Sequence, residues 1–320
     1  MRNRMKFMNA LGPLFGLMIV FGLFAVIGPD SFSSSSNLQT IARQTAIVGT
    51  AALGMTLVII LGGIDLSAGS VIALGTVVIA ALLQAGVPPL VAASGGVLVG
   101  ALCGILNGTL ITGLRVVPFI VTLGTLLVVR GAAKGLAHEQ KIDAPLTWLK
   151  DLLAALPPGD TWQLVPPGVW ITGVLAFIVA GLLHFTALGR HIYAIGSNEQ
   201  TARLCGVAVD RVKIIVYSLC GVFAGLAGVM QFSRLTVGDP TVAVGIELDV
   251  IAAVVIGGGS LSGGEGSILG SIVGALIMTV IRSGCSQIGL PNWVQEIVTG
   301  SIIVVAVALD RFRHRSQRGA

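Results

Sequence analysis

The sequence predicts an all-α membrane protein, a polytopic bundle of about ten transmembrane helices with glycine-rich breaks. Composition gives the first reason: hydrophobic residues form 54% of the 320-residue chain and charged residues only 10%, and the mean hydropathy is +0.95. A soluble domain carries about 25% charged residues. Apolar runs of membrane-crossing length also recur along the chain. Finally, 44 glycines with 5% aromatic residues favour helices that pack through small side chains.

The first predicted span follows a basic N-terminal tail, residues 1–10, which carries Arg2, Arg4 and Lys6. An uncharged run extends over residues 7–29, enough to cross a bilayer. No small-residue cleavage site closes this run, so we expect an uncleaved span and not a signal peptide. Residues 30–37 then form an outside loop. The second span follows Arg43 and ends near Asp65.

Spans three to five come from the longest uncharged part of the chain. Residues 66–114 contain no charge, which is too long for one helix, and AGVPP at 85–89 supplies a turn. Arg115 marks a short cytoplasmic return. Span five covers residues 116–133.

The stretch 136–168 is predicted to be the longest loop on the periplasmic side. Trp148, Leu149, Leu152, Leu153 and Leu156 recur at helical spacing, so this part could lie flat at the interface until the prolines at 157 and 158 end it. An irregular loop is the alternative.

Spans six and seven are residues 169–185 and 214–233. The apolar pieces 250–256 and 268–281 are shorter, and they form either two short spans or one broken helix. Span ten, residues 297–309, leads into the C-terminal tail 310–320 with its arginines, Arg311, Arg313, Arg315 and Arg318. Loops and tails rich in Lys and Arg stay in the cytoplasm, so both termini are predicted to be cytoplasmic and the number of spans even.

The loop 186–213 is the main charged interruption between spans. Its basic residues, Arg190, Arg203, Arg211 and Lys213, outnumber Glu199 and Asp210, which predicts a cytoplasmic position. A capping box between Ser197 and Gln200 and a stop at Gly206 predict a short helix within it. A loop that only maintains topology is the competing interpretation.

Two glycine-rich breaks match each other. GGIDLSAG at 62–69 and GGGSLSGG at 257–264 share GG, LS and a later glycine at a constant offset. Paired breaks are typical of transporters built from internal repeats, so Asp65, Ser67, Gly258 and Ser262 are candidates for the translocation path. Asp65 has a second interpretation, because Asp65 or Ser67 could cap the helix that follows. The match itself could be chance in a glycine-rich chain.

Four stretches carry a resemblance to a known family: GMTLVIILGGIDLSAGS at 54–70, the loop 186–213, KIIVYSLCG at 213–221 and GIELDVIAAVVIGGGSLSGGEGSILG at 245–270. They resemble the permease subunit of bacterial ATP-driven sugar importers of the ribose type, over residues 37–309. The resemblance implies a single permease domain, 1–320, in the inner membrane. It also implies a second permease subunit, a periplasmic sugar-binding protein and a cytoplasmic ATP-binding subunit as partners.

In this family the segment 194–207 is the coupling helix that docks on the ATPase. The residues that the resemblance assigns to this role are Gly196, Ser197, Asn198, Glu199, Ala202, Arg203, Leu204 and Gly206. The chain reads GSN at 196–198 and LCG at 204–206, where relatives usually read GGN and LSG.

Several other functions lack their residues. LSGGE at 261–265 looks like an ATPase signature, but the sequence contains no GxxxxGK[ST] phosphate loop and an apolar run follows, so we expect no ATP binding. The four cysteines have no metal-like spacing, and neither a metal nor a cofactor is expected. The net charge of +5 comes from cytoplasmic segments and does not indicate nucleic acid.

Two other classes of function compete with the importer. A secondary transporter usually needs carboxylates within the bundle, where only Asp65 and Glu265 lie close, and an intramembrane enzyme needs a nucleophile with a base, or metal ligands. Arg130, Lys134 and Arg282 are predicted to extend from helix ends toward the interface. Acidic residues of the stretch 239–249 are predicted to lie outside, as a partner surface or a solvated loop: Asp239, Glu247 and Asp249.

Overall fold

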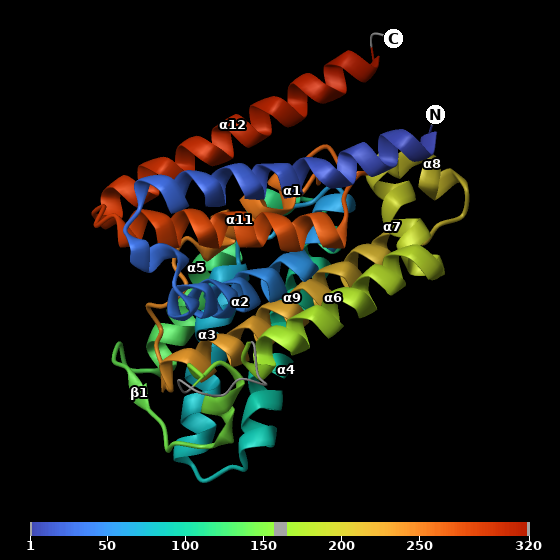
Figure 1. Cartoon of the computed structure of the whole chain (residues 1–320). Helices are drawn as coiled ribbons and strands as arrows, with labels where there is room; N and C mark the ends of the chain where they lie inside the picture. The colour runs from blue at the N-terminus through green and yellow to red at the C-terminus, as the bar shows by residue number, and fades with distance from the viewer. Residues whose placement is uncertain (1, 157–164, 319–320) are drawn as a thin grey trace.

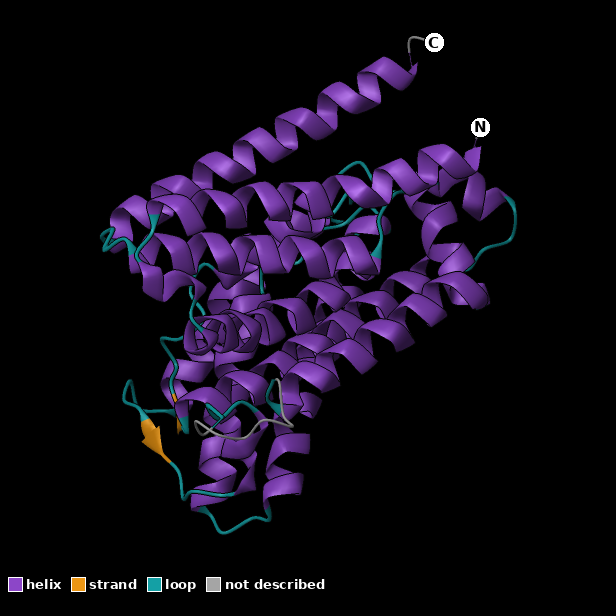
Figure 2. Ribbon diagram, viewed as in Figure 1, coloured by secondary structure: helices purple, strands orange, loops and turns teal. Residues whose placement is uncertain are grey.

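The computed structural model describes residues 2–156 and 165–318, and most of them are helical (Figure 2). The predicted end of the loop helix at residues 157 and 158 lies outside this part, as do residues 1, 319 and 320 of the tails. The long helices are α1 (Arg2–Ile27), α2 (Ser35–Ile60), α3 (Ala68–Gln84), α4 (Pro89–Leu114), α5 (Pro118–Leu136), α6 (Pro167–Phe185), α9 (Val209–Leu235), α11 (Ile268–Gln287) and α12 (Asn292–Arg318).

Shorter elements connect these helices. They are η1 (Asp30–Ser33), η2 (Trp148–Leu152), α7 (Ala187–Ser197), α8 (Glu199–Leu204) and α10 (Ile246–Ile256), with the strands β1 (Ile142–Asp143) and β2 (Val237–Gly238). The two strands pair antiparallel, Ile142 opposite Gly238. A pair of two-residue strands does not change the class, so the helical fold is confirmed.

Six described helices, α2, α4, α5, α6, α9 and α11, are long and apolar enough to cross a membrane. Shorter apolar stretches lie at Gly12–Ile27, Ala68–Gln84 and Asn292–Ala308. This supports a helical multi-pass membrane protein. The number of ten spans stays a prediction.

The bundle has two distinct ends. Figure 1 shows α7 and α8 at one end with the N- and C-terminal residues nearby, and β1 at the opposite end. We call these the α7–α8 end and the β1 end.

Helix α9 is central, and it packs most extensively against α4 and also against α2 and α3. Glycines make this approach possible. Cβ atoms added at Gly100, Gly104 or Gly108 of α4 would collide with the α9 backbone, and one added at Gly221 of α9 would collide with α4. Packing through small residues, as the composition predicts, therefore holds this helix pair together.

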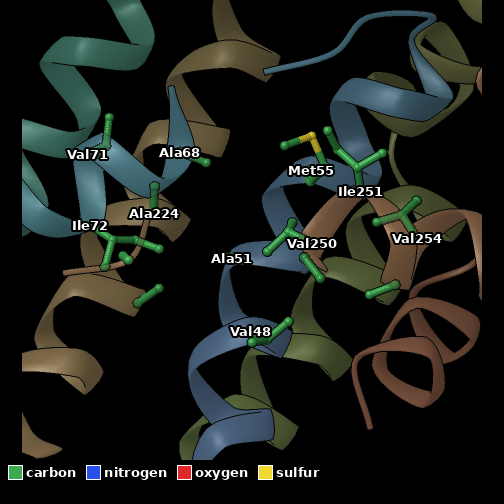
Figure 3. Close-up of a cluster of buried hydrophobic side chains, with 14 of the residues drawn as sticks. Val48, Ala51, Met55, Ala68, Val71, Ile72, Ala224, Val250, Ile251 and Val254 are labelled. Atoms are coloured by element: carbon green, nitrogen blue, oxygen red, sulfur yellow. The ribbon is translucent and has the colours of Figure 1, made fainter. Parts of the chain in front are cut away.

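The largest apolar cluster joins six helices, and Figure 3 labels residues from four of them, α2, α3, α9 and α10. Val48, Ala51 and Met55 come from α2 and face α10, which contributes Val250, Ile251 and Val254. On the other side α3 meets α9, through Ala68, Val71, Ile72 and Ala224. Helix α10 is thus buried in the bundle.

The short pieces predicted at 250–256 and 268–281 form a hairpin. Helices α10 and α11 pack side by side, and Gly270 and Gly274 lie against the backbone of Gly257 and Ala253. Helix α10 has 11 residues and is therefore only about 16 Å long, roughly half of a bilayer core. It is neither a full span nor half of a straight broken helix.

A non-helical segment, residues 236–245, precedes α10 and includes β2. It follows α3: Gly238 lies against Ala80, and the carbonyl of Ala243 lies against Gly69. Irregular backbone at membrane depth is tolerated only where protein or water satisfies its polar groups. Arg130 of α5 does this by donating Nη1 to the carbonyls of Pro240 (3.0 Å) and Val242 (2.7 Å). The prediction that Arg130 extends toward the interface is therefore wrong.

The predicted loops at the β1 end also need correction. Helix α2 begins at Ser35, because Ser34 accepts a hydrogen bond from the amide of Asn37, so the loop expected at 30–37 is shorter. The apolar positions near 150 form the 3₁₀ turn η2, and Leu149 and Leu153 are fully buried. The amide of Leu153 donates to Ser233 Oγ (2.9 Å), so this turn packs on α9 and not flat on a membrane surface.

Candidate functional site

The candidate site is built on α7 and α8, which form a compact helical unit. Thr186 caps α7 by accepting from the amide of Gly189 (3.1 Å). Asn198 caps α8 by accepting from the amide of Thr201 (2.8 Å). The predicted capping box at Ser197 is therefore one residue off, because α7 continues through Ser197 and only Asn198 leaves the helical conformation.

The predicted stop at Gly206 is confirmed. Gly206 is left-handed, with φ +84°. Its amide donates to the carbonyl of Arg203 (3.1 Å), and the amide of Val207 donates to that of Ala202 (3.1 Å). This is the Schellman pattern, and it satisfies carbonyls that a six-residue helix would otherwise leave free.

Charged side chains tie α8 to the start of α9. Arg203 pairs with Glu199 (3.5 Å) and with Asp210 (2.9 Å), and Lys213 pairs with Glu199 (2.8 Å). Hydrogen bonding to Asp210 raises the pKa of the Arg203 guanidinium. Single exposed ion pairs stabilise little, but this network fixes the direction in which α8 points.

The two faces of α8 differ sharply. Ala202 is 4% exposed and packs toward α9, whereas Leu204 is 89% exposed. A large apolar side chain held outward on a rigid, charged loop is suited to a pocket on another protein. Nothing in the described part of the chain covers Leu204.

The end of α7 meets both glycine-rich breaks at one point, which we call the glycine joint: Ile60, Gly62, Gly196, Gly263 and Gly264. The amide of Gly264 donates to the carbonyl of Ile60 (2.8 Å). A Cβ atom on Gly196 would collide with that carbonyl and approach the Gly264 nitrogen to 2.6 Å. A Cβ atom added to Gly263 would lie 3.0 Å from the Cα of Gly62. Only glycine at position 196 lets the three segments come together.

The breaks are turns at the α7–α8 end and not unwound helices in mid-bundle. Gly62, Gly258, Gly263 and Gly264 all have positive φ. The second break folds on itself: the amide of Ser260 donates to the carbonyl of Glu265 (3.1 Å), and that of Gly263 to Ser260 (3.0 Å). Tyr193 of α7 donates its hydroxyl to the carbonyl of Gly266 (2.9 Å), which adds a second link to the same turn.

Among the path candidates, Asp65 and Ser67 are buried, at 2% and 0% exposure. Asp65 Oδ1 accepts from the Ser67 amide (2.9 Å) and hydroxyl (2.6 Å), and Asn107 Nδ2 donates to Ser67 Oγ (2.9 Å). Asp65 thus closes a turn one step before α3, which begins at Ala68. Ser262 and Gly258, both exposed, belong to the second break.

A polar cavity of about 350 Å³, which was not predicted from the sequence, lies away from this site. Its polar lining includes Gln44, Gln231, Arg234, Asp249, Arg282 and Gln295. Arg282 pairs with Asp249 (2.6 Å), so it does not extend alone to the interface, and Asp249 is 1% exposed, so it is not on an outer patch. A charged residue within each of two apolar helices was the signal that could have revealed this pair.

Comparison with known proteins places the chain in a family. A family model described as branched-chain amino acid transport system / permease component matches residues 37–307. The chain is 40% identical to the ribose import permease protein of Escherichia coli K12 over 297 residues, 93% of this chain and 92% of that protein. It is 42% identical to the ribose import permease protein of Bacillus subtilis over 305 residues, 95% and 93% of the two chains. The L-arabinose ABC transporter permease protein of Azospirillum brasilense is 34% identical over 314 residues, 98% and 91% of the two chains.

No solved structure matches the chain. The family model nevertheless covers most of its length, including α7, α8 and both glycine-rich breaks. The chain therefore belongs to this family of transport-system permease components.

Proposed function

We propose that the chain is the membrane-spanning permease subunit of an ATP-driven importer. It passes a small sugar, a ribose-like pentose or a hexose, from a periplasmic binding protein across the bacterial inner membrane. The observation that carries the proposal is the α7–α8 unit, rigid, exposed at Leu204 and joined at Gly196 to both glycine-rich turns. A loop that only maintained topology would not need this joint.

The substrate class follows from the relatives and not from the family description. That description names branched-chain amino acids. The relatives of 34% to 42% identity, which align over more than nine-tenths of the chain, are by their names permeases for ribose and L-arabinose. Similarity over the whole length is a closer guide to the solute than the description of a broad family.

The proposed topology puts the α7–α8 end in the cytoplasm. This places the loop 186–213, the N-terminal tail 1–10 and the C-terminal tail 310–320 on the side where Lys and Arg collect, and the loop 136–168 in the periplasm. The two termini and α7–α8 share one end of the bundle, which supports this arrangement (Figure 1). Cys205 is exposed beside Leu204, so an impermeant thiol reagent should fail to label it in intact cells and should label it in inverted vesicles.

The cytoplasmic partner is a separate ATP-binding subunit that hydrolyses ATP. Its docking surface consists of the eight residues Gly196, Ser197, Asn198, Glu199, Ala202, Arg203, Leu204 and Gly206. In this proposal Leu204 is the apolar anchor, and Glu199 and Arg203 are its polar rim. Gly196 and Ala202 do not contact the partner directly but pack against the rest of the bundle and so hold the unit in place. A second permease subunit completes the membrane part, and lipid surrounds it.

Asp65, Ser67, Gly258 and Ser262 keep a proposed role at the cytoplasmic end of the translocation path. Asp65 and Ser67 hold the first turn, and Gly258 and Ser262 belong to the second. Their proximity to the glycine joint connects them to the docking surface.

Reconstitution in vesicles tests the function. Uptake of D-ribose, L-arabinose or D-allose should require the ATP-binding subunit, the binding protein and ATP, and it should be insensitive to collapse of the proton gradient. Uptake by the permease alone under a proton gradient would identify a secondary transporter instead. Uptake of L-leucine but of no sugar would refute the proposed substrate class.

A further inference from the structure

The polar cavity of about 350 Å³ lies within one subunit, between α2, α9, α10, α11 and α12. Its lining residues stand near the ends of these helices that face away from α7 and α8: Gln44 early in α2, Gln231 late in α9 and Arg282 late in α11. Under the proposed topology this is the periplasmic side. The glycine joint and the docking surface lie at the other end.

The cavity holds polar groups that have no partner in the protein. Gln231 is 4% exposed, lines the cavity, and hydrogen bonds to no group in the described part of the chain. Gln44 on the facing helix also lines the cavity without a hydrogen-bond partner among the described residues, but it is only half-buried. A buried amide without a partner costs free energy, so a site that retains one is completed by water or by a ligand.

Two of the three charged side chains that line the cavity pair with each other. Asp249 and Arg282 neutralise each other at 2.6 Å, and the other carboxylate oxygen, Oδ1, is buried without a hydrogen-bond partner among the described residues. Arg234 is the remaining cation. Apolar side chains of Ile47, Val48 and Met278 complete the wall.

We propose that this cavity binds one monosaccharide-sized, uncharged polyol as it enters the permease, a step that rests on the proposed function. Amides and a paired carboxylate and guanidinium can donate to and accept from neighbouring hydroxyls, while the apolar wall covers the C–H face of the sugar. The volume suits such a ligand, because it equals roughly a dozen waters at about 30 Å³ each. It is also at the lower end of the range for small-molecule sites, about 300–1,000 Å³.

A free amino acid fits this cavity less well. Its ammonium and carboxylate groups would have to separate Asp249 from Arg282, and a branched apolar side chain would face the Gln44 and Gln231 amides. A sugar acid would place its carboxylate on Arg234. These two ligand classes are therefore the alternatives that the experiment must separate from a neutral sugar.

Ligand-observed NMR on the full-length permease in nanodiscs tests the inference without transport. Saturation transfer is measured for D-ribose, L-arabinose, D-allose, D-ribonate and L-leucine. We expect signals from at least one neutral sugar, and a dissociation constant raised about tenfold in Gln231→Leu and in Gln44→Leu, because each loses one buried hydrogen bond. Gln39→Leu, on α2 but outside the cavity, is the matched control and should bind normally.

The outcomes distinguish this site from the proposed function. ATP-dependent sugar uptake with equal sugar binding in wild type, Gln231→Leu and Gln44→Leu would overturn the cavity site and leave the importer intact. No saturation transfer from any of the three sugars, or transfer only from D-ribonate or L-leucine, would also overturn it. Absence of ATP-dependent sugar uptake by the wild-type complex would instead refute the proposed function.

Discussion

Gly196→Ala is the most direct perturbation of the glycine joint. It adds one methyl group to α7 at a position where the Cβ would collide with the carbonyl of Ile60 and approach the Gly264 nitrogen to 2.6 Å. That carbonyl and that nitrogen are hydrogen bonded to each other at 2.8 Å. The methyl group therefore acts as a wedge between α7 and both glycine-rich turns.

The size of the effect follows from three contributions. Overpacking a tight contact costs about 1–3 kcal/mol, and loss of the hydrogen bond between Gly264 and Ile60 costs about 1 kcal/mol. The higher helix propensity of alanine stabilises α7 by up to about 1 kcal/mol relative to glycine. The net destabilisation is about 1–3 kcal/mol, and at roughly 2 °C per kcal/mol the apparent melting temperature should fall by about 2–6 °C.

The assay is thermal unfolding of the permease in detergent, followed by loss of the monodisperse elution peak and compared at one heating rate, because such unfolding is irreversible. Gly124→Ala in α5 is the control, since its Cβ would meet nothing within 4 Å. Uptake by the complete importer should fall in Gly196→Ala and stay normal in the control. Equal melting temperatures and equal uptake for the two variants would refute the idea of a tight joint.

Three further sets of substitutions probe Leu204, Asp65 and the pair of Asp249 and Arg282. Leu204→Glu should leave the amount of permease unchanged, weaken co-purification of the ATP-binding subunit about tenfold or more, and abolish uptake, because it buries an unpaired charge in the docking surface. Normal uptake would show that the loop only maintains topology. Asp65→Asn should leave the melting temperature nearly unchanged, since an amide oxygen can still accept from Ser67. Asp65→Leu should lower the free energy of unfolding by about 2–4 kcal/mol and reduce the folded yield. An Asn variant that folds normally yet transports nothing would show that the charge is needed. Arg282→Met should lower the free energy of unfolding by about 3 kcal/mol, because it leaves the buried Asp249 without its partner. The double variant Asp249→Leu with Arg282→Met should recover most of this loss in thermal unfolding. Additive losses would mean that the two residues are not coupled.

Local signals explain which features the sequence could predict. The turn at 85–89, the stop at Gly206 and the approximate extent of most spans depend on neighbouring residues, and the structure has them where expected. The observed helix ends differ slightly from the predicted ones where two neighbouring residues could each serve as the cap. At the end of α7, both Ser197 and Asn198 are good capping residues, and packing of Gly196 against Ile60 decides that the helix continues to Ser197.

Contacts between distant segments explain what could not be predicted. Leu149 and Leu153 have the spacing of an interfacial helix, but Ser233, about 80 residues later, fixes them as a turn. Arg130 and Arg282 stand near the ends of apolar helices, where an arginine normally reaches for water. Here Arg130 meets the carbonyls of residues 240 and 242, and Arg282 meets Asp249, and neither partner is visible from local sequence.

Helix α10 connects the two functional regions. It begins beside the cavity, which Ile246 and Asp249 line, and it ends at Gly257, where the second glycine-rich turn starts. The helix has 11 residues and is about 16 Å long, so a single hydrogen-bonded element joins Asp249 to the turn. At the cavity end the helix continues into irregular backbone that Arg130 holds by two hydrogen bonds and not by a continuous helix. The cavity and the second glycine-rich turn thus lie at the two ends of one short helix, which packs along its length against α11 and α2.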